Sequence, residues 1–585
     1  MTDYFEVHER DGAGRVGELR LSDSVRTPAL VDDVLADAGS LWPGEREVPD
    51  GDESVLTVLP HRALPGGTPE EVREAFAVEY PDVEYPSAAV VAPDTAADAS
   101  AAGTDAYILS NAQELTGHAG AFVTAVVRTR EAIPADSALY LPGVATPANV
   151  ATLAYAGVDL VDTDHAVVKG TQGRYLAVDG EYFLEDLTDL PCACPACQQP
   201  VGDFGREDCE THNVNALRAA LATVRERIRS GRLRDYIEGQ ARHEGWLTAV
   251  FRRLDQQYGY LEQRTPVLRR AEVTATSDDT LRRVEIQRFA ERVTGRYHCR
   301  FDNPLVLVPC SARKPYSESQ SHGQFHDAIQ FRAHVVSMTS PIGVVPQELE
   351  LTYPAQHYDA AVTGHWSATE TAFVADVLEA YLRRNDYPRV VAHVPAEYRE
   401  ICERVEGRLD RDFEYTVVDH PTTGESLSNL ASTLSTELKY GKRERQHNTL
   451  RAVADYQFGD GAGDGIFEEL RVESHYPKLR AHDADGEQLA ALVPEYGVLS
   501  LTLAGARRWL DSDAPTRRVE IDGFVPHGSV LAPGVVDADD SIRVGDEVVV
   551  EGPHAFAVGR AEMSGPEMAE STRGVATRVR HVEER

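Results

Sequence analysis

Lysine is almost absent from this chain of 585 residues, which carries five lysines beside 53 arginines. Aspartate and glutamate together number 95, so the formal net charge is -37. This balance excludes a generic nucleic-acid binder that works through bulk positive charge. The acidic residues are spread along the chain rather than gathered in one tail. We therefore interpret the acidity as that of a halophilic protein surface in a very salty cytoplasm, rather than as an acidic tail or the mimicry of a partner.

Long apolar runs are also lacking, since none approaches the roughly 20 residues that span a bilayer. The N-terminus, Met1-Thr2-Asp3-Tyr4, does not have the basic and then apolar pattern of a signal peptide. The hydrophobic content of 42% is enough to build cores and excludes a largely disordered chain. We therefore expect a soluble cytoplasmic protein without membrane association, with about four domains at roughly 150 residues each.

Strand-like and helix-like segments alternate in two parts of the chain. The first hundred or so residues are predicted to be irregular, whereas residues 105–164 have the alternation of an α/β domain with parallel strands. A second α/β unit is predicted from residue 303, with strands at 305–308, 389–394 and 415–418 and helices at 370–384 and 396–405. Residues 427–510 have mixed character, and the remaining segment has the short strands and turns of a small β-barrel.

The chain has seven cysteines, a small and odd number that does not suit a disulfide framework. Four of them lie close together. Cys192, Cys194 and Cys197 form a C-x-C-x-x-C triplet, and His212 follows. Three thiolates and one imidazole satisfy the tetrahedral preference of Zn²⁺. Cys209 is near enough to replace His212 as the fourth ligand. No open coordination position is implied, so we predict a structural zinc site.

An arginine-rich helix is predicted directly after the cysteine cluster. Val214, Leu217, Leu221, Val224 and Ile228 give it one apolar face. Several arginines share another face, and residues 214–270 contain twelve Arg against six acidic residues. Either this stripe contacts phosphate oxygens of a nucleic acid, or it forms salt bridges within the protein. The arginines considered for phosphate contact are Arg218, Arg225 and Arg229, with Arg232 on the same face.

A second cluster of reactive residues follows the predicted strand at 305–308. Cys310 stands at the carboxyl end of that strand, where α/β domains present reactive groups. Arg313, Lys314 and His322 come next, and nearby cations favour a thiolate. Alternatively, Cys310 is a small apolar residue at a strand end. Polar and aromatic residues at 353–359 and 363–366 either line the same pocket or pack as ordinary loops.

Taken together, these motifs resemble the archaeosine synthases, paralogues of archaeal tRNA-guanine transglycosylase that modify the D-arm of tRNA. Residues 157–162 resemble the transglycosylase strand that ends in a nucleophilic aspartate, at Asp162. The cysteine triplet with His212-Asn213 resembles the family's zinc site, which implies His212 rather than Cys209 as the fourth ligand. Residues 309–322 resemble the signature that separates these synthases from the transglycosylases. Residues 528–535, 545–548 and 559–561 resemble a PUA domain, an RNA-binding barrel.

The resemblance implies an α/β protein of four parts. These are a degenerate transglycosylase-like β/α barrel with a zinc subdomain (1–275), a second α/β domain forming the synthase core (276–426), a small α+β domain (427–507) and the C-terminal PUA β-barrel (508–585). The transglycosylase general-base motif, Asp-Ser-Gly-Gly-Phe-Gln, is absent from the first 150 residues, and the barrel is shortened. Base exchange needs both a nucleophile and a proton-transfer partner, so Asp162 is only an alternative catalytic residue.

The implied reaction adds an amine to the nitrile of 7-cyano-7-deazaguanine in tRNA and gives an amidine. Lysine is the expected amine donor, and glutamine or ammonia is the alternative donor. A radical SAM enzyme is the expected partner, and the protein is expected to form a homodimer. We assign catalysis to Cys310, Lys314 and His322: the thiol attacks the nitrile, and the other two move protons. Two other functions stay open, a base-exchange transglycosylase that uses Asp162 and a non-catalytic tRNA-binding subunit.

Overall fold

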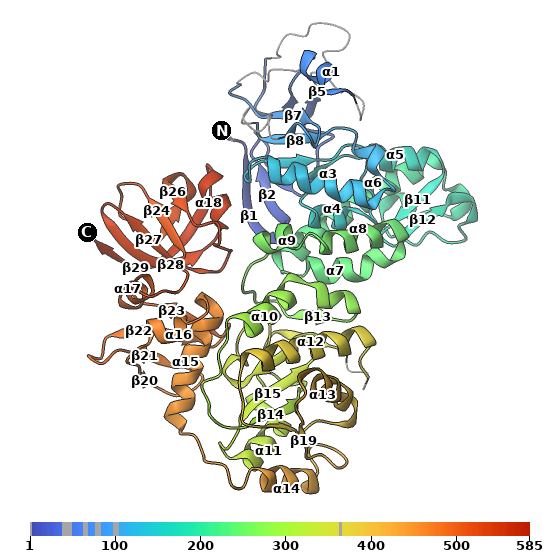
Figure 1. Ribbon diagram of the computed structural model, residues 1–585. Coiled ribbons are helices and arrows are strands. Elements are labelled where there is room, and N and C mark those ends of the chain that lie inside the picture. The colour runs from blue at the N-terminus through green and yellow to red at the C-terminus, as the bar shows by residue number, and fades with distance from the viewer. Residues whose placement is uncertain (1–2, 38–49, 62–67, 77–82, 97–103, 362–364) are drawn as a thin grey trace. The chain divides into compact units, whose positions relative to one another are not determined.

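The computed structural model describes residues 3–37, 50–61, 68–76, 83–96, 104–361 and 365–585 (Figure 1). Its contacts divide the chain into two compact units. The first comprises residues 1–266 together with 530–544 and 563–576, and the second comprises residues 267–529, 545–562 and 577–585. Among the described residues, no helix is both long and apolar enough to cross a membrane.

The first unit is built around a seven-stranded sheet of order β4-β10-β9-β8-β7-β6-β5 whose neighbouring strands are parallel. The seven strands are β4 (Ala29–Leu30), β5 (Leu35–Asp37), β6 (Leu56–Val58), β7 (Ser87–Val91), β8 (Ala106–Leu109), β9 (Ala138–Tyr140) and β10 (Leu160–Val161). Apolar side chains of these strands form one buried cluster, including Val58, Ala88, Ile108 and Leu160. The open order of the described strands, with β4 and β5 at the two edges, is consistent with the expected degenerate barrel.

The expectation of an irregular N-terminal region is wrong. An antiparallel sheet of β1 (Phe5–Asp11), β2 (Gly14–Leu19) and β3 (Val25–Thr27) precedes the parallel strands, and β4 to β7 also lie there. Strands β3 to β7 have only two to five residues. Segments this short carry too few residues to show a period of two, so only their pairing in the fold defines them.

The helices of the first unit follow the strands and continue into the arginine-rich segment. They are α1 (Glu70–Ala75), α3 (Ala119–Ala132), α4 (Val150–Tyr155), α5 (Asp164–Thr171), α6 (Arg206–Arg229), α7 (Leu233–Gln240), α8 (Gly245–Asp255) and α9 (Tyr258–Arg264). The hairpin of β11 (Arg174–Ala177) and β12 (Gly180–Phe183) lies between α5 and α6. In α6 the predicted apolar face is confirmed, since Leu217, Leu221, Val224 and Ile228 are buried.

The second unit begins with an α/β sandwich around a sheet of order β16-β15-β14-β18-β19, parallel except for the pair β15 and β16. Its elements are β13 (Val273–Ala275), α10 (Val284–Gly295), β14 (Leu305–Pro309), α11 (Gln320–Ile329), β15 (His334–Thr339), β16 (Gly343–Pro346), β17 (Tyr358–Ala360), α12 (Ala368–Arg384), β18 (Val390–Ala392), α13 (Ala396–Leu409), β19 (Glu414–Tyr415) and α14 (Gly424–Thr433). These bounds confirm the predicted alternation of strands and helices from residue 303.

The two faces of this sheet bury alternate side chains of β14. Leu305 and Leu307 pack with residues of α10, α12 and α13, whereas Val306 and Val308 pack with residues of α11 and α14. Helices on both faces explain why β14 is a continuous apolar run. Because the helices cover the two faces, polar side chains are expected at the carboxyl end of β14 rather than on either face.

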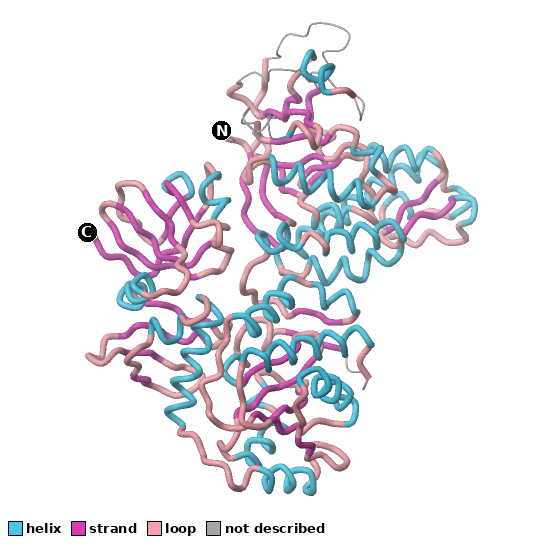
Figure 2. Tube along the Cα trace, in the orientation of Figure 1, coloured by secondary structure: helices cyan, strands magenta, loops and turns pink. Residues whose placement is uncertain are grey.

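The remaining elements are a small α+β part and a β-rich part, and Figure 2 shows their strands in magenta. The first contains α15 (Lys442–Phe458), α16 (Ala462–Ile466), the antiparallel strands β20 (Arg471–Glu473), β21 (Arg480–His482), β22 (Gln488–Val493) and β23 (Val498–Leu501), and α17 (Leu503–Asp511). The second contains β24 (Arg518–Ile521), β25 (Ser529–Leu531), β26 (Val535–Ala538), β27 (Glu547–Gly552), β28 (Ala555–Ala561), α18 (Gly565–Glu570) and β29 (Val575–Glu584). The predicted strand-rich C-terminus is thus confirmed.

Candidate functional site

Three thiols and one imidazole converge in the first unit. The ligand atoms of Cys192, Cys194, Cys197 and His212 all lie within 4.8 Å of one another. His212 Nδ1 is 3.6 Å from Cys194 Sγ and 3.3 Å from Cys197 Sγ, and the two sulfurs are 3.6 Å apart. A tetrahedral ion with Zn–S bonds of ~2.3 Å and a Zn–N bond of ~2.0–2.1 Å separates its ligand atoms by roughly 3.5–3.8 Å. The cluster therefore has the donors and the spacing to hold a metal ion.

Helix α6 orients the imidazole of His212 through hydrogen bonds to one residue of β11, Leu176. His212 Nε2 donates to the carbonyl of Leu176 at 2.9 Å, and the amide N–H of Leu176 donates to Asn213 Oδ1 at 2.8 Å. The ring of Tyr175 stacks on His212 with centroids 3.7 Å apart. The hydrogen bond from Nε2 leaves Nδ1 as the metal-facing nitrogen. Cys209 lies outside the cluster, because its Sγ donates to the carbonyl of Arg174 at 3.2 Å.

The arginine face of α6 is partly engaged within the protein. Arg218 is exposed. Arg225 is half-buried and donates to the carbonyl of Pro28 at 2.6 Å; burial, with the charges of Arg229 and Arg26, lowers the pKa of its guanidinium. Arg229 pairs with Glu226 at 2.6 Å and lies 4.0 Å from Glu9. Both alternatives for this face, phosphate contact and internal pairing, thus have residues that suit them.

Asp162 follows β10 at the carboxyl edge of the parallel sheet. Its carboxylate is buried and accepts hydrogen bonds from Tyr140 Oη and from the Gly143 amide, both at 2.7 Å. Burial raises the pKa of Asp162, against the lowering effect of these bonds. The described part of the chain places no histidine, lysine or second carboxylate in hydrogen-bond contact with this group.

Cys310 directly follows β14 in the second unit. Its amide donates to the carbonyl of Met338 at 3.2 Å, and its half-buried thiol lies 3.4 Å from Tyr398 Oη. The ring of Tyr398, in the first turn of α13, packs on Trp366 with centroids 4.4 Å apart. The thiol therefore stands at the carboxyl edge of the sheet, beside a hydroxyl and two aromatic rings.

Lys314 and His322 belong to the same loop and helix as Cys310. Lys314 Nζ lies 3.8 Å from the centre of the Tyr358 ring, and burial lowers the pKa of this lysine against the opposing charge of Cys310. His322 is buried, and its Nε2 donates to the carbonyl of Pro309 at 3.0 Å. Burial and the charge of His326 lower the pKa of His322 to about 4. His322 is therefore neutral near pH 7 and braces the residue before Cys310.

Of the two polar and aromatic segments noted in the sequence, Tyr358 and Trp366 lie beside this loop, whereas Thr363 and Gly364 are outside the described residues. Sequence reasoning missed Tyr398. A usable signal existed, because the start of a helix after β18 lies at the same sheet edge as the end of β14.

Family models of known proteins match four segments of the chain. Residues 92–245 match the queuine tRNA-ribosyltransferase family, 286–434 a domain of unknown function, 448–515 the patch-forming domain C2 of tRNA-guanine transglycosylase, and 521–582 the PUA domain. The fold and these matches define a transglycosylase-like protein with a C-terminal PUA domain.

Among full-length relatives, the archaeosine synthase of Haloferax volcanii is 66% identical over 100% of both chains. The archaeosine synthase subunit alpha of Methanosarcina acetivorans is 42% identical, again over 100% of both chains. The tRNA-guanine(15) transglycosylase of Methanothermobacter thermautotrophicus is 28% identical over 78% of this chain and 68% of its own. The chain belongs to the archaeosine synthase family.

Proposed function

We propose that this protein acts on tRNA in archaeosine biosynthesis, by adding an amine to the nitrile of 7-cyano-7-deazaguanine in the D-arm. Membership of the archaeosine synthase family supports the pathway, and the transglycosylase and PUA matches support tRNA as the substrate. Lysine is the proposed amine donor. A radical SAM enzyme is the proposed partner that cleaves the lysine adduct, and a homodimer in the cytoplasm is the proposed state.

The observation that carries the proposal is the placement of Cys310 at the sheet edge beside Lys314 and Tyr398. The Cys310 sulfur adds to the nitrile carbon while the nitrogen takes up a proton, which gives a thioimidate. The amine then adds to the same carbon and expels the thiolate, which gives the amidine and regenerates Cys310. No electrons are gained or lost overall, so the chemistry needs no redox cofactor.

Lys314 suits the proton transfers, because its lowered pKa brings it closer to neutral pH. Tyr398 Oη is near enough to the thiol to pass a proton to or from it. His322 was expected to move protons as well. Its hydrogen bond to Pro309 suits a positioning role, since it fixes the end of β14.

The other assignments are part of the same proposal. The ion held by Cys192, Cys194, Cys197 and His212 is a structural Zn²⁺ that fixes the β11–β12 hairpin on α6. Arg218 contacts tRNA phosphates from its exposed position, and Arg225 and Arg229 exchange internal partners for phosphate when tRNA binds. The four-part division at residues 275, 426 and 507 is retained as the proposed domain organisation.

The decisive experiment is single-turnover formation of the amidine nucleoside, read by mass spectrometry with lysine, glutamine and ammonia supplied singly. Cys310→Ala should lose several orders of magnitude in rate while keeping fold and tRNA affinity. Cys310→Ser serves as a near-isosteric control for packing. Asp162→Asn should cost much less, since among the described residues Asp162 has no histidine, lysine or second carboxylate in hydrogen-bond contact. An inactive Asp162→Asn beside an active Cys310→Ala would move the chemistry to the transglycosylase-like sheet.

A further inference from the structure

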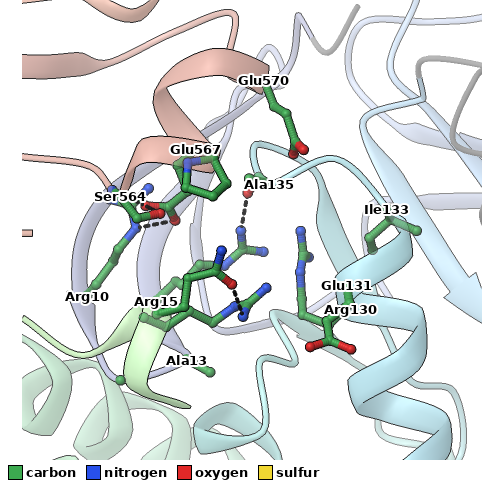
Figure 3. Close-up of a pocket in the computed structure, with 14 residues that line it drawn as sticks. Arg10, Ala13, Arg15, Arg130, Glu131, Ile133, Ala135, Ser564, Glu567 and Glu570 are labelled. Carbon is green, nitrogen blue, oxygen red and sulfur yellow. Dashed lines mark hydrogen bonds and ion pairs between the residues drawn. The ribbon is translucent and has the colours of Figure 1, made fainter. Parts of the chain in front are cut away.

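A cavity of about 280 Å³ lies within the first unit, away from Asp162 and from the cysteine cluster (Figure 3). Arginines from β1, β2, α3 and α9 reach it, and residues of α18 and the segment before it close it. The arginines are Arg10, Arg15, Arg130 and Arg264. Arg15 binds Asp159, which precedes β10, whereas Asp162 follows it. The cavity therefore lies toward the amino ends of the parallel strands, opposite the edge that carries Asp162.

The buried guanidinium groups of the cavity wall share their carboxylate partners. Asp159 forms an ion pair with Arg15 and lies 3.8 Å from Arg130, so one buried carboxylate serves two buried cations. Glu567 pairs with Arg10 at 3.0 Å, and the charge of Arg264 also lowers the pKa of Glu567. Asp159 and Glu567 are thus each shared between two guanidinium groups. The wall also carries the exposed residues Glu131 and Glu570, and the charge of Arg130 acts on the carboxylate of Glu570.

Arg130 is the least exposed of these four arginines. This side chain is 4% exposed, and within the described residues its hydrogen bonds go to the carbonyls of Ser137, at 2.9 Å, and Pro134, at 2.5 Å. Burial and the charge of Arg15 lower the pKa of Arg130 to about 9. Carbonyl oxygens orient a guanidinium but do not neutralise it, so the charge of Arg130 is balanced by Asp159, which Arg15 shares, and by the exposed Glu570.

The strand pairing brings two of these arginines together. Arg10 and Arg15 are direct partners across the antiparallel pair of β1 and β2. Like charges placed opposite each other on a sheet are destabilising. In Figure 3 the Arg15 and Arg130 side chains point toward the same space, with Glu567 and Glu570 on its other side. Four arginines thus line one cavity in a chain whose net charge is -37.

We propose that this cavity binds a phosphate dianion. A phosphate monoester or free phosphate carries about two negative charges near neutral pH, and it would supply a counter-charge to Arg15 and Arg130, which share Asp159. Planar guanidinium forks bind phosphate oxygens in pairs. The volume is near the lower end of the roughly 300–1,000 Å³ of small-molecule sites, so it suits a phosphate or a phosphate terminus. The site is independent of the amidine chemistry at Cys310.

Calorimetric titration of the full-length protein with inorganic phosphate, in KCl buffer, tests the site. The wild-type chain should bind one phosphate saturably, and Arg130→Met should weaken binding at least tenfold. Arg128→Met is the matched control on the same helix, because Arg128 is 57% exposed and pairs with Asp94 at 3.1 Å. Its phosphate affinity should be unchanged. No saturable binding by the wild type, or equal affinity in Arg130→Met, would overturn the proposal.

Two further measurements distinguish a loss of phosphate binding from a loss of folding, and identify the molecule that supplies the phosphate. If Arg130→Met does not fold, Arg264→Met tests the same cavity through a half-buried side chain; phosphate should raise the Tm of the wild type and not that of Arg264→Met. An equal rise in both would count against the site. Competition by AMP identifies a mononucleotide as the source. Competition by tRNA with its 5′-phosphate, but not by dephosphorylated tRNA, identifies the tRNA terminus.

Discussion

Asn213 is predicted to hold the metal cluster together although it is not a ligand. The side chain is completely buried in α6, and its Oδ1 accepts the amide N–H of Leu176 at 2.8 Å. Its Nδ2 donates to the carbonyls of Ala166, at 3.0 Å, and Arg174, at 2.9 Å. The substitution Asn213→Ala removes all three bonds and leaves the backbone groups without that partner.

The size of the effect follows from these contacts. A buried donor or acceptor left unpaired costs about 1–3 kcal/mol. The Leu176 N–H should incur this cost in full, whereas the carbonyl of Arg174 keeps the thiol of Cys209 as a donor. We therefore expect a loss of about 2–5 kcal/mol in the local stability of the β11–β12 hairpin on α6. Because Leu176 also anchors the imidazole of His212, zinc affinity should fall by about 10–100-fold, as for other residues that orient metal ligands.

A competition assay with a chromophoric zinc chelator measures the affinity, and hydrogen exchange of residues 174–183 measures the local stability. Thr223→Ala is the matched control, because Thr223 is exposed on the same helix and its hydroxyl donates within that helix, to the carbonyl of Ala219. The control should leave zinc affinity and exchange unchanged. If Asn213→Ala also leaves both unchanged, the reasoning that α6 aims His212 through β11 is refuted.

Lys314→Met should lower the single-turnover rate by about 10²–10⁴-fold with unchanged tRNA affinity, and Lys314→Arg should stay slow because arginine does not give up its proton; a fully active Lys314→Arg would contradict proton transfer. Buried His334 faces Glu348 at 2.9 Å, and that carboxylate overcomes burial and raises the pKa of His334 to about 10. The pair should contribute its full stability below pH ~6.5 and lose it as the pH rises toward 10, so His334→Gln should flatten the fall in unfolding free energy over that range; an unchanged slope would reject the effect. Binding of tRNA should have a shallow salt dependence and weaken when three arginines become glutamine, measured by filter binding, and unchanged affinity would remove phosphate contact by Arg218, Arg225 and Arg229.

The sequence alone determined features that depend on short spacings. The cysteine triplet and His212 lie within 21 residues, and a tight loop followed by a helix brings such residues together in almost any fold. The same holds for Cys310, because an apolar run of four residues predicts β14 and hence the sheet edge where the thiol stands. The family motifs are local in the same sense, which is why the order of residues is enough to indicate the archaeosine synthases.

Tertiary structure decided what depends on pairing between distant residues. The strands β4 to β7 are too short to have a readable period, and they exist because each finds a parallel neighbour. Arg225 was predicted to share a helix face with Arg218, but in the fold it is half-buried and donates to the carbonyl of Pro28. Arg15, Arg130 and Asp159 come from three separate elements. Local spacing is set by the chain's own geometry, whereas shared burial and uneven charge pairing arise only when folding brings separate segments together.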